Sequence, residues 1–104
     1  NMKAWGMSVT VREYANMLCR KFHFEETRRT GHTFFVLRIE GLPPVRTMAS
    51  HNRKQDIGRQ LESKLARELR VSTAFFRDMF SCTKSCRDYC DWLRERHANG
   101  MDNA

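Results

Sequence analysis

The sequence predicts an α+β fold: a three-stranded antiparallel sheet with helices on one face, in the order α-β-β-β-α, followed by further C-terminal helices. Helical periodicity of apolar residues occurs near both ends of the first 70 residues. Between these two stretches lie three short segments of strand composition, joined by connections too short for parallel crossovers. The 104 residues are enough for one domain with a single core.

The first helix is expected over residues 10–22. Thr10 and Glu13 have the spacing of a capping box, in which each side chain satisfies a free backbone N–H group at the helix start. Apolar residues at helical spacing then predict one buried face, made of Val11, Tyr14, Ala15, Leu18 and Phe22.

Three strands are predicted next, over residues 22–27, 32–40 and 45–50. The central strand is the strongest of the three, because aromatic and β-branched residues dominate it. Gly31 favours a turn before this strand. The two consecutive prolines after it cannot donate to a ladder, so they belong to the connection.

Alternation along the central strand separates its two faces. The nearly apolar set that begins at Thr33 should pack against the helices. The other set should be open to a ligand, and it consists of His32, Phe34, Val36, Arg38 and Glu40.

The second long helix is expected to follow the third strand. Asp56 can cap it, and Ile57, Leu61, Leu65 and Leu69 fall at every fourth position after the cap. These four residues predict one apolar stripe that packs on the sheet.

Two more helices are predicted in the C-terminal third, one starting at Ser72 and one at a capping box of Ser85 with Asp88. We therefore divide the chain into an α+β core, residues 1–70, and a helical extension packed on the same domain, residues 71–104. These short helices cannot bury their apolar stripe between themselves. The stripe must pack on the core or on a second chain, such as the partner in a homodimer.

The charge of the chain points to a polyanionic partner. The net charge is +7, and arginine outnumbers lysine by 14 to 5. Residues 20–70 hold 12 basic and 6 acidic side chains, whereas residues 71–104 hold 5 of each. An Arg-rich excess on a small domain suggests RNA or DNA, and a solvated basic surface is the alternative.

No apolar run approaches the roughly 20 residues that span a bilayer, so no membrane partner is expected. We expect a cytoplasmic protein with reduced thiols. Cys82, Cys86 and Cys90 are separated by gaps of three residues, whereas zinc sites usually show shorter paired gaps. We expect these thiols to pack as small hydrophobes, with metal or redox use as the alternative, and we expect no metal and no cofactor.

Two short motifs resemble the HicA-like toxins, small mRNA interferases with a double-stranded-RNA-binding-type fold. The first is Gly31-His32-Thr33-Phe34 at the start of the central strand. The second is SHNRKQDIG, residues 50–58, before the Leu-rich helix. The resemblance covers about residues 10–70, and the C-terminal extension lies beyond it. It implies that His32 is the catalytic residue of RNA cleavage and that a HicB-like antitoxin covers the site.

The residue types fit that chemistry. Cleavage of RNA without a metal needs a base for the ribose 2′-hydroxyl and donors for the phosphate, and histidine suits the proton steps because its ordinary pKa lies near 6.5. His32 is the candidate base. The candidate nucleic-acid-binding residues are Phe34, Arg38, Arg46, His51, Arg53, Lys54 and Arg59.

Two other functions are left open by the sequence. One is a non-catalytic module for double-stranded nucleic acid, in which Arg53, Lys54, Arg59 and Lys64 grip phosphates. The other is a protein-interaction domain that assembles through its C-terminal helices. The expected RNA partner is an mRNA or a double-stranded RNA.

Overall fold

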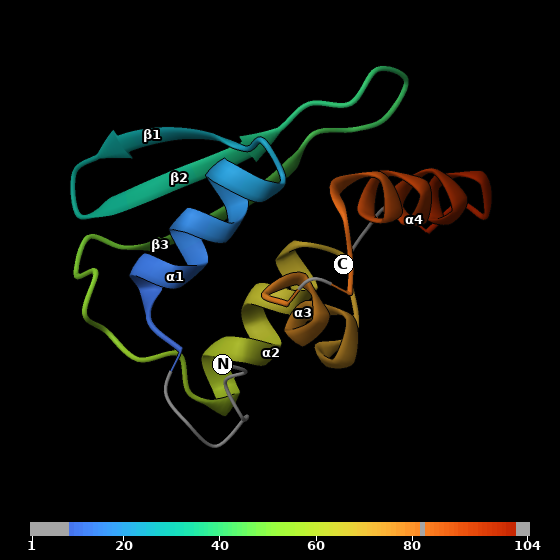
Figure 1. Ribbon diagram of the computed structural model, residues 1–104. Helices are drawn as coiled ribbons and strands as arrows, with labels where there is room; N and C mark the ends of the chain where they lie inside the picture. The colour runs from blue at the N-terminus through green and yellow to red at the C-terminus, as the bar shows by residue number, and fades with distance from the viewer. Residues whose placement is uncertain (1–8, 82, 102–104) are drawn as a thin grey trace.

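The computed structural model describes residues 9–81 and 83–101 of the chain, and it confirms the α+β class. Four α-helices and one π-helical turn accompany three strands in the described residues (Figure 1). The elements in chain order are α1 (Val11–Asn16), η1 (Met17–Lys21), β1 (Glu25–Arg29), β2 (His32–Leu37), β3 (Val45–Ser50), α2 (Arg59–Glu68), α3 (Thr73–Met79) and α4 (Cys86–Ala98).

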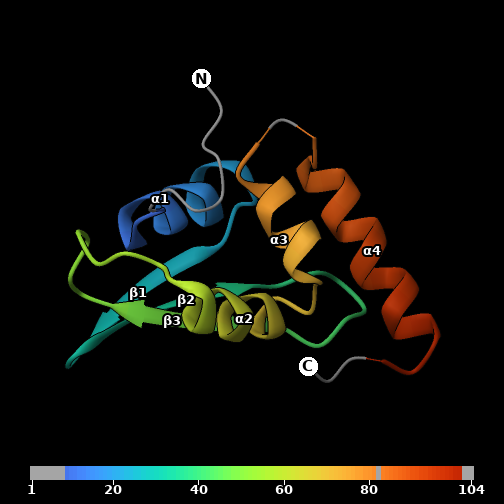
Figure 2. The same cartoon turned by 90° about the horizontal axis from the view of Figure 1, so that it is seen from below.

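The sheet is antiparallel with the strand order β1-β2-β3, as predicted. Helices α1, α2 and α3 lie on one side of it, and α4 lies beyond its end (Figures 1 and 2). Arg29 pairs with His32, so the turn between β1 and β2 contains only two residues. The second of them, Gly31, has a φ of 81°, a conformation that glycine adopts without a steric penalty.

Two strand boundaries differ from the prediction, and the third strand agrees with it. The first strand was predicted over 22–27, but β1 begins three residues later. The central strand was predicted over 32–40, but β2 ends at Leu37, because Arg38 and the residues after it make no ladder pair. Strand β3 occupies the predicted 45–50.

The first helix begins as predicted and changes its winding halfway. Thr10 and Glu13 form the capping box, with backbone-to-side-chain distances of 3.0 and 3.3 Å. In η1 the backbone N–H of Phe22 donates to the carbonyl of Met17 at 3.2 Å, which is the wider π-helical spacing. His23 then has a φ of 63°, which ends the helix and explains why β1 cannot start at residue 22.

The predicted cap of α2 is wrong. The helix begins at Arg59 with Gly58 as its N-cap, and no side chain caps it. Asp56 instead forms an isolated antiparallel bridge with Thr10. Because this bridge holds the chain extended at Asp56, the helix starts only after it.

The caps of the last two helices are as predicted. The Ser72 hydroxyl accepts the N–H of Phe75 at 3.1 Å, at the start of α3. Ser85 and Asp88 form a capping box at the start of α4, at 2.9 and 3.1 Å. None of the helices in the described ranges is long and apolar enough to cross a membrane.

Aromatic side chains from helix and sheet meet in one core. The ring of Tyr14 lies 6.2 Å from that of Phe35 on β2 and 5.9 Å from that of Phe76 on α3, and all three are fully buried. Glu62 of α2 is also buried, and its carboxylate accepts two hydrogen bonds from Arg77 of α3, at 2.7 and 3.1 Å. The ion pair therefore connects α2 to α3 beside the core.

The C-terminal helices pack on this core. The buried ring of Tyr89 lies 5.5 Å from that of Phe22, and its hydroxyl donates to the carbonyl of Leu69 at 2.8 Å. The indole N–H of Trp92 donates to the carbonyl of Arg70 at 2.8 Å. The apolar stripe of α3 and α4 is therefore covered largely within the same chain.

Candidate nucleic-acid interface

The register of the strands defines which residues share the face of the sheet that the helices leave uncovered. Directly opposite residues in an antiparallel ladder lie on the same face. On β2 the alternate residues from Thr33 to Leu37 are buried, whereas His32 is exposed and the other residues are half-buried. We call the uncovered side the open face. It has three cross-strand rows: Glu25–Val36–Arg46, Thr27–Phe34–Met48 and Arg29–His32–Ser50.

Phe34 lies in the middle row of the open face. Its ring is half-buried, and the guanidinium carbon of Arg29 lies 5.6 Å from the ring centroid. This is a cation–π contact in which the guanidinium group of Arg29 lies over the ring of Phe34. Both kinds of planar group can stack on a nucleobase.

His32 lies at the end of the open face, between Arg29 on β1 and Ser50 on β3. Its side chain is exposed, so a ligand can reach the imidazole without any rearrangement. The Ser50 hydroxyl already accepts the N–H of Asn52 at 3.0 Å. The row therefore places the imidazole of His32 beside the guanidinium group of Arg29.

Arg46 lies at the opposite end of the open face from His32. It is exposed, and no ion pair found within the described residues involves it. Arg38 is also exposed, but it follows the last residue of β2, so strand alternation does not assign it to a face. His32, Phe34 and Arg46 are thus the predicted residues that share the open face.

The remaining predicted residues lie in or near the connection from β3 to α2. Arg53 makes an ion pair with Glu26 at 2.9 Å. Lys54 and Arg59 are exposed. His51 is half-buried, and its Nε2 atom is buried without a hydrogen-bond partner in the described part of the chain. These four residues are therefore separate from the rows of the open face.

Arg29 is the open-face residue that the sequence analysis missed. The predicted strand ended at residue 27, which left Arg29 in the turn. A two-residue turn at Thr30 and Gly31 is the signal that could have placed it opposite His32.

A second basic surface lies between the first helix and β1. A groove of about 500 Å³ is lined there by Arg12, Arg20 and Arg53, with Cys19 and Glu26 among its other residues. Because Glu26 pairs with Arg53, part of the positive charge in this groove is already neutralised. Burial, and then Glu26, raise the pKa of the Cys19 thiol, so the thiolate is disfavoured.

The C-terminal cysteines are free and half-buried in so far as the structure describes them. Cys86 and Cys90 lie on α4, and burial followed by the neighbouring Cys90 raises the pKa of the Cys86 thiol. Cys82 lies outside the described residues. Among residues 9–81 and 83–101, no group of three or more histidine, cysteine or acidic side chains is arranged to hold a metal ion.

Comparison of the chain with protein-family models, with curated proteins and with solved structures gave no match. The function of the chain is therefore inferred from the geometry of the open face.

Proposed function

We propose that this protein binds RNA on its open face, with a base stacked at Phe34 and phosphates held by Arg29 and Arg46. The observation that carries this proposal is the contact between Arg29 and Phe34 on the uncovered side of the sheet. Exposed aromatic rings and arginines on a sheet are a common means of holding the unstacked bases of a single strand. The net charge of +7 favours any polyanion.

His32 is the proposed base for cleavage of the bound strand. It takes the proton of a ribose 2′-hydroxyl, and the 2′-oxygen then attacks the adjacent phosphorus. The bond from phosphorus to the 5′-oxygen breaks, and that oxygen takes a proton from water. The products are a 2′,3′-cyclic phosphate and a 5′-hydroxyl end. Arg29, which pairs with His32 across the ladder, can neutralise the phosphate charge.

The resemblance to the HicA-like toxins adds three expectations that stay predictions: an mRNA substrate, a HicB-like antitoxin over the open face, and a cytoplasmic location. The double-stranded alternative has less support, because Arg53, one of its four phosphate-gripping residues, is ion-paired with Glu26.

RNA binding is tested with a fluorescently labelled single-stranded RNA in which every 2′-hydroxyl is methylated, so that it cannot be cleaved. We expect Phe34→Ala to weaken binding by about 1–3 kcal/mol through lost stacking. Arg46→Ala should reduce the slope of log K against log salt by about 0.7. Arg94→Ala on α4 is the matched charge control. Equal losses for Arg46→Ala and Arg94→Ala would contradict binding on the open face.

Cleavage is tested separately with unmodified RNA in the presence of a chelator. We expect the wild type to produce cyclic-phosphate ends and His32→Ala to lose this activity by about 100-fold or more, while both bind the methylated RNA equally. His97→Ala on α4 is the matched histidine control. If neither protein cleaves RNA but both bind it, the proposed cleavage is wrong and the proposed binding stands.

A further inference from the structure

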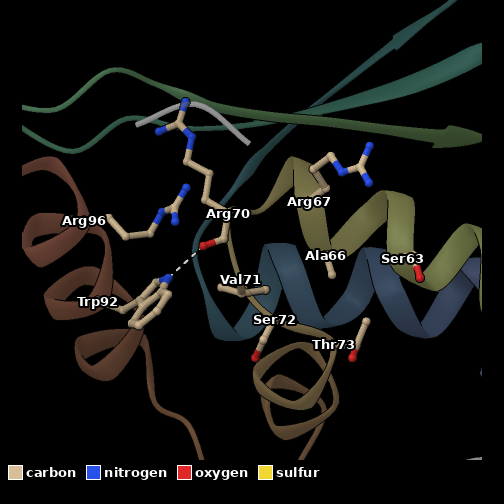
Figure 3. Close-up of a pocket in the computed structure, with 9 residues that line it drawn as sticks. All are labelled: Ser63, Ala66, Arg67, Arg70, Val71, Ser72, Thr73, Trp92 and Arg96. Carbon is tan, nitrogen blue, oxygen red and sulfur yellow. Dashed lines mark hydrogen bonds between the residues drawn. The ribbon is translucent and has the colours of Figure 1, made fainter. Parts of the chain in front are cut away.

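The sheet has two outer edges, and the end of α2 lies against the edge formed by β3. The N–H of Met48 on β3 donates to the carboxylate of Glu68 at 3.4 Å. Figure 3 shows the Arg70 side chain extending from the end of α2 toward the sheet, where its guanidinium group donates to the carbonyl of Pro44 at 3.1 Å. The backbone along β3 is therefore partly paired by side chains of the same chain.

The edge formed by β1 is open. All five residues of β1 are exposed, and the strand lies at the outer margin of the sheet (Figure 1). Arg29 and His32 close the two-residue turn as a hydrogen-bonded pair, and such pairs alternate along an antiparallel ladder. The backbone groups of Glu26 and Arg28 therefore point outward, away from β2. No other backbone group of the described residues pairs with them.

The charges of β1 are arranged in two halves of opposite sign, because the strand reads EETRR. Charges of one sign on an edge strand repel a second copy of that strand. Two copies of β1 that run antiparallel about Thr27 instead bring opposite charges together. Glu25 faces the partner's Arg29 in this arrangement, and Glu26 faces the partner's Arg28. A parallel arrangement would place like charges opposite each other.

The backbone hydrogen bonds select the same register as the charges. Because Glu26 lies opposite the partner's Arg28, the outward N–H and carbonyl groups of both residues pair across the interface. Thr27 then lies on the two-fold axis, opposite its own copy, in a non-hydrogen-bonded pair. A shift by two residues keeps the hydrogen bonds but places Glu26 or Arg28 opposite its own copy, which like charges disfavour.

The contacts that these side chains already make are compatible with this pairing. Glu26 forms an ion pair with Arg53 at 2.9 Å, and a carboxylate can accept from two arginines. The Arg29 guanidinium group has five donors, so an ion pair across the interface leaves donors for a phosphate. No ion pair within the described residues involves Glu25 or Arg28.

We propose that two copies of this chain associate through β1, antiparallel about Thr27, so that two three-stranded sheets join into one of six strands. The interface is a single strand pair, which is smaller than that of stable complexes, so we expect a dissociation constant of about 10 µM to 1 mM. The two open faces then form one surface, and the row that contains His32 continues across the axis to the partner's Arg46. The dimer does not rest on RNA binding, because it is measured without RNA.

The first experiment is sedimentation velocity of the full chain over about 10 µM to 1 mM, at about 0.15 M salt, which screens the repulsion between two chains of net charge +7. We expect a concentration-dependent dimer. Glu25→Lys and Arg29→Glu should each weaken it by about tenfold or more, because each places like charges opposite each other twice. An equimolar mixture of the two variants should dimerise again, because opposite charges then face each other in both pairs.

The matched controls are Glu40→Lys and Arg87→Glu, which make the same changes of charge at exposed residues outside β1. Both should change the dissociation constant by less than about threefold. Circular dichroism checks that each variant is folded. A wild type that stays monomeric at about 1 mM, equal losses for the variants and the controls, or a mixture that stays monomeric would overturn the proposal.

A second experiment tests the register without changing a charge. In the dimer the two Thr27 Cα atoms are about 4.5 Å apart, which is within reach of a disulfide. Under mild oxidation Thr27→Cys should therefore give a cross-linked dimer, and peptide mapping should place the bond between the two copies of position 27. Thr73→Cys, at the exposed start of α3, is the matched control. Equal cross-linking of the two variants would show random collision and would also overturn the proposal.

Discussion

Two buried threonines on the helix-facing side of the sheet differ in their hydrogen-bond partners. Thr33 and Thr47 are 1% and 3% exposed. The Thr47 hydroxyl lies 2.8 Å from that of Tyr14 and donates to the carboxylate of Glu68 at 2.6 Å, so it joins β3 to α1 and α2. The Thr33 hydroxyl has no hydrogen-bond partner within the described residues. A buried hydroxyl stabilises the fold only where it has hydrogen-bond partners. Replacing each threonine by valine should therefore change the free energy of unfolding in opposite directions.

We predict that Thr47→Val lowers the free energy of unfolding by about 2 kcal/mol, because the buried Tyr14 hydroxyl and the half-buried Glu68 carboxylate each lose a hydrogen bond. Thr33→Val should be neutral or raise it by about 1 kcal/mol, because the isosteric methyl group removes an unsatisfied hydroxyl. Urea unfolding followed by circular dichroism measures both. A similar loss of stability for the two variants would mean that burial volume matters here and hydrogen bonding does not.

At the scale of elements, the helix starts could be predicted from sequence where a side chain makes the cap. The side chains of Thr10, Ser72 and Ser85 each accept the backbone N–H three residues ahead, so the cap can be predicted from neighbouring residues in the sequence. Asp56 carries the same local signal, but a bridge to Thr10 across the fold overrides it. Thr10 and Asp56 are 46 positions apart in the chain, so the local pattern that predicts a cap does not show their contact.

Which residues share the open face could be predicted along a single strand but not across the strands. Alternation along β2 assigned His32 and Phe34 to a common face, because side-chain direction follows from the strand period. The neighbours across the ladder depend on register, and the two-residue turn at Thr30 and Gly31 fixes the register of β1 on β2. This turn brings Arg29 opposite His32, two residues beyond the predicted end of the first strand. Alternation along a single strand does not show such a pairing.

The capping box of α4 gives a prediction with a pH dependence. Hydrogen bonds from the backbone, and then the side chain, of Ser85 lower the pKa of Asp88. A carboxyl whose pKa is lower in the folded state stabilises the fold above its ordinary titration range, and this contribution is lost as the pH falls through the lowered pKa. Asp88→Asn should therefore unfold at a lower temperature than the wild type at pH 7.

The difference between wild type and Asp88→Asn should shrink as the pH falls through the lowered pKa of Asp88. Ser85→Ala serves as the comparison, because loss of its hydroxyl cap should cost about 1 kcal/mol at neutral pH. Calorimetric melting temperatures across the pH range provide the measurement. A difference that stays constant from neutral to acid pH would show that the carboxylate charge of Asp88 plays no part in the cap.

At the scale of the whole molecule, the C-terminal helices complete the core and do not merely lie beside it. Phe76 and Met79 of α3, and Tyr89 and Leu93 of α4, are all at most 3% exposed. The ring of Tyr89 alone packs on three other rings, which belong to Phe22 at the end of the first helix, Phe24 just before β1 and Phe75 of α3. The helical extension is thus part of the same packing unit as the sheet.

We predict that a fragment of residues 1–71 does not fold. Burial of one large apolar side chain contributes about 1.5 to 3 kcal/mol. The four buried residues of α3 and α4 therefore contribute about 6 to 12 kcal/mol, which is comparable with the whole stability of a small domain. The fragment would also leave Phe22 and Leu69 exposed to water, although both are fully buried in the full chain. Circular dichroism and the amide dispersion in an NMR spectrum measure the outcome.

A control for this truncation is the full chain with Tyr89→Phe, which keeps the ring packing and removes only the hydroxyl bond to Leu69, at about 1 kcal/mol. That variant should fold, whereas the fragment should give the narrow amide dispersion of an unfolded chain. A cooperative urea transition of the fragment would mean that the α+β core is an independent domain. In that case the C-terminal helices could detach, and their apolar stripe would become available to a partner. If the fragment is unfolded, deletion cannot test assembly through these helices, and single surface substitutions on α4 must be used instead.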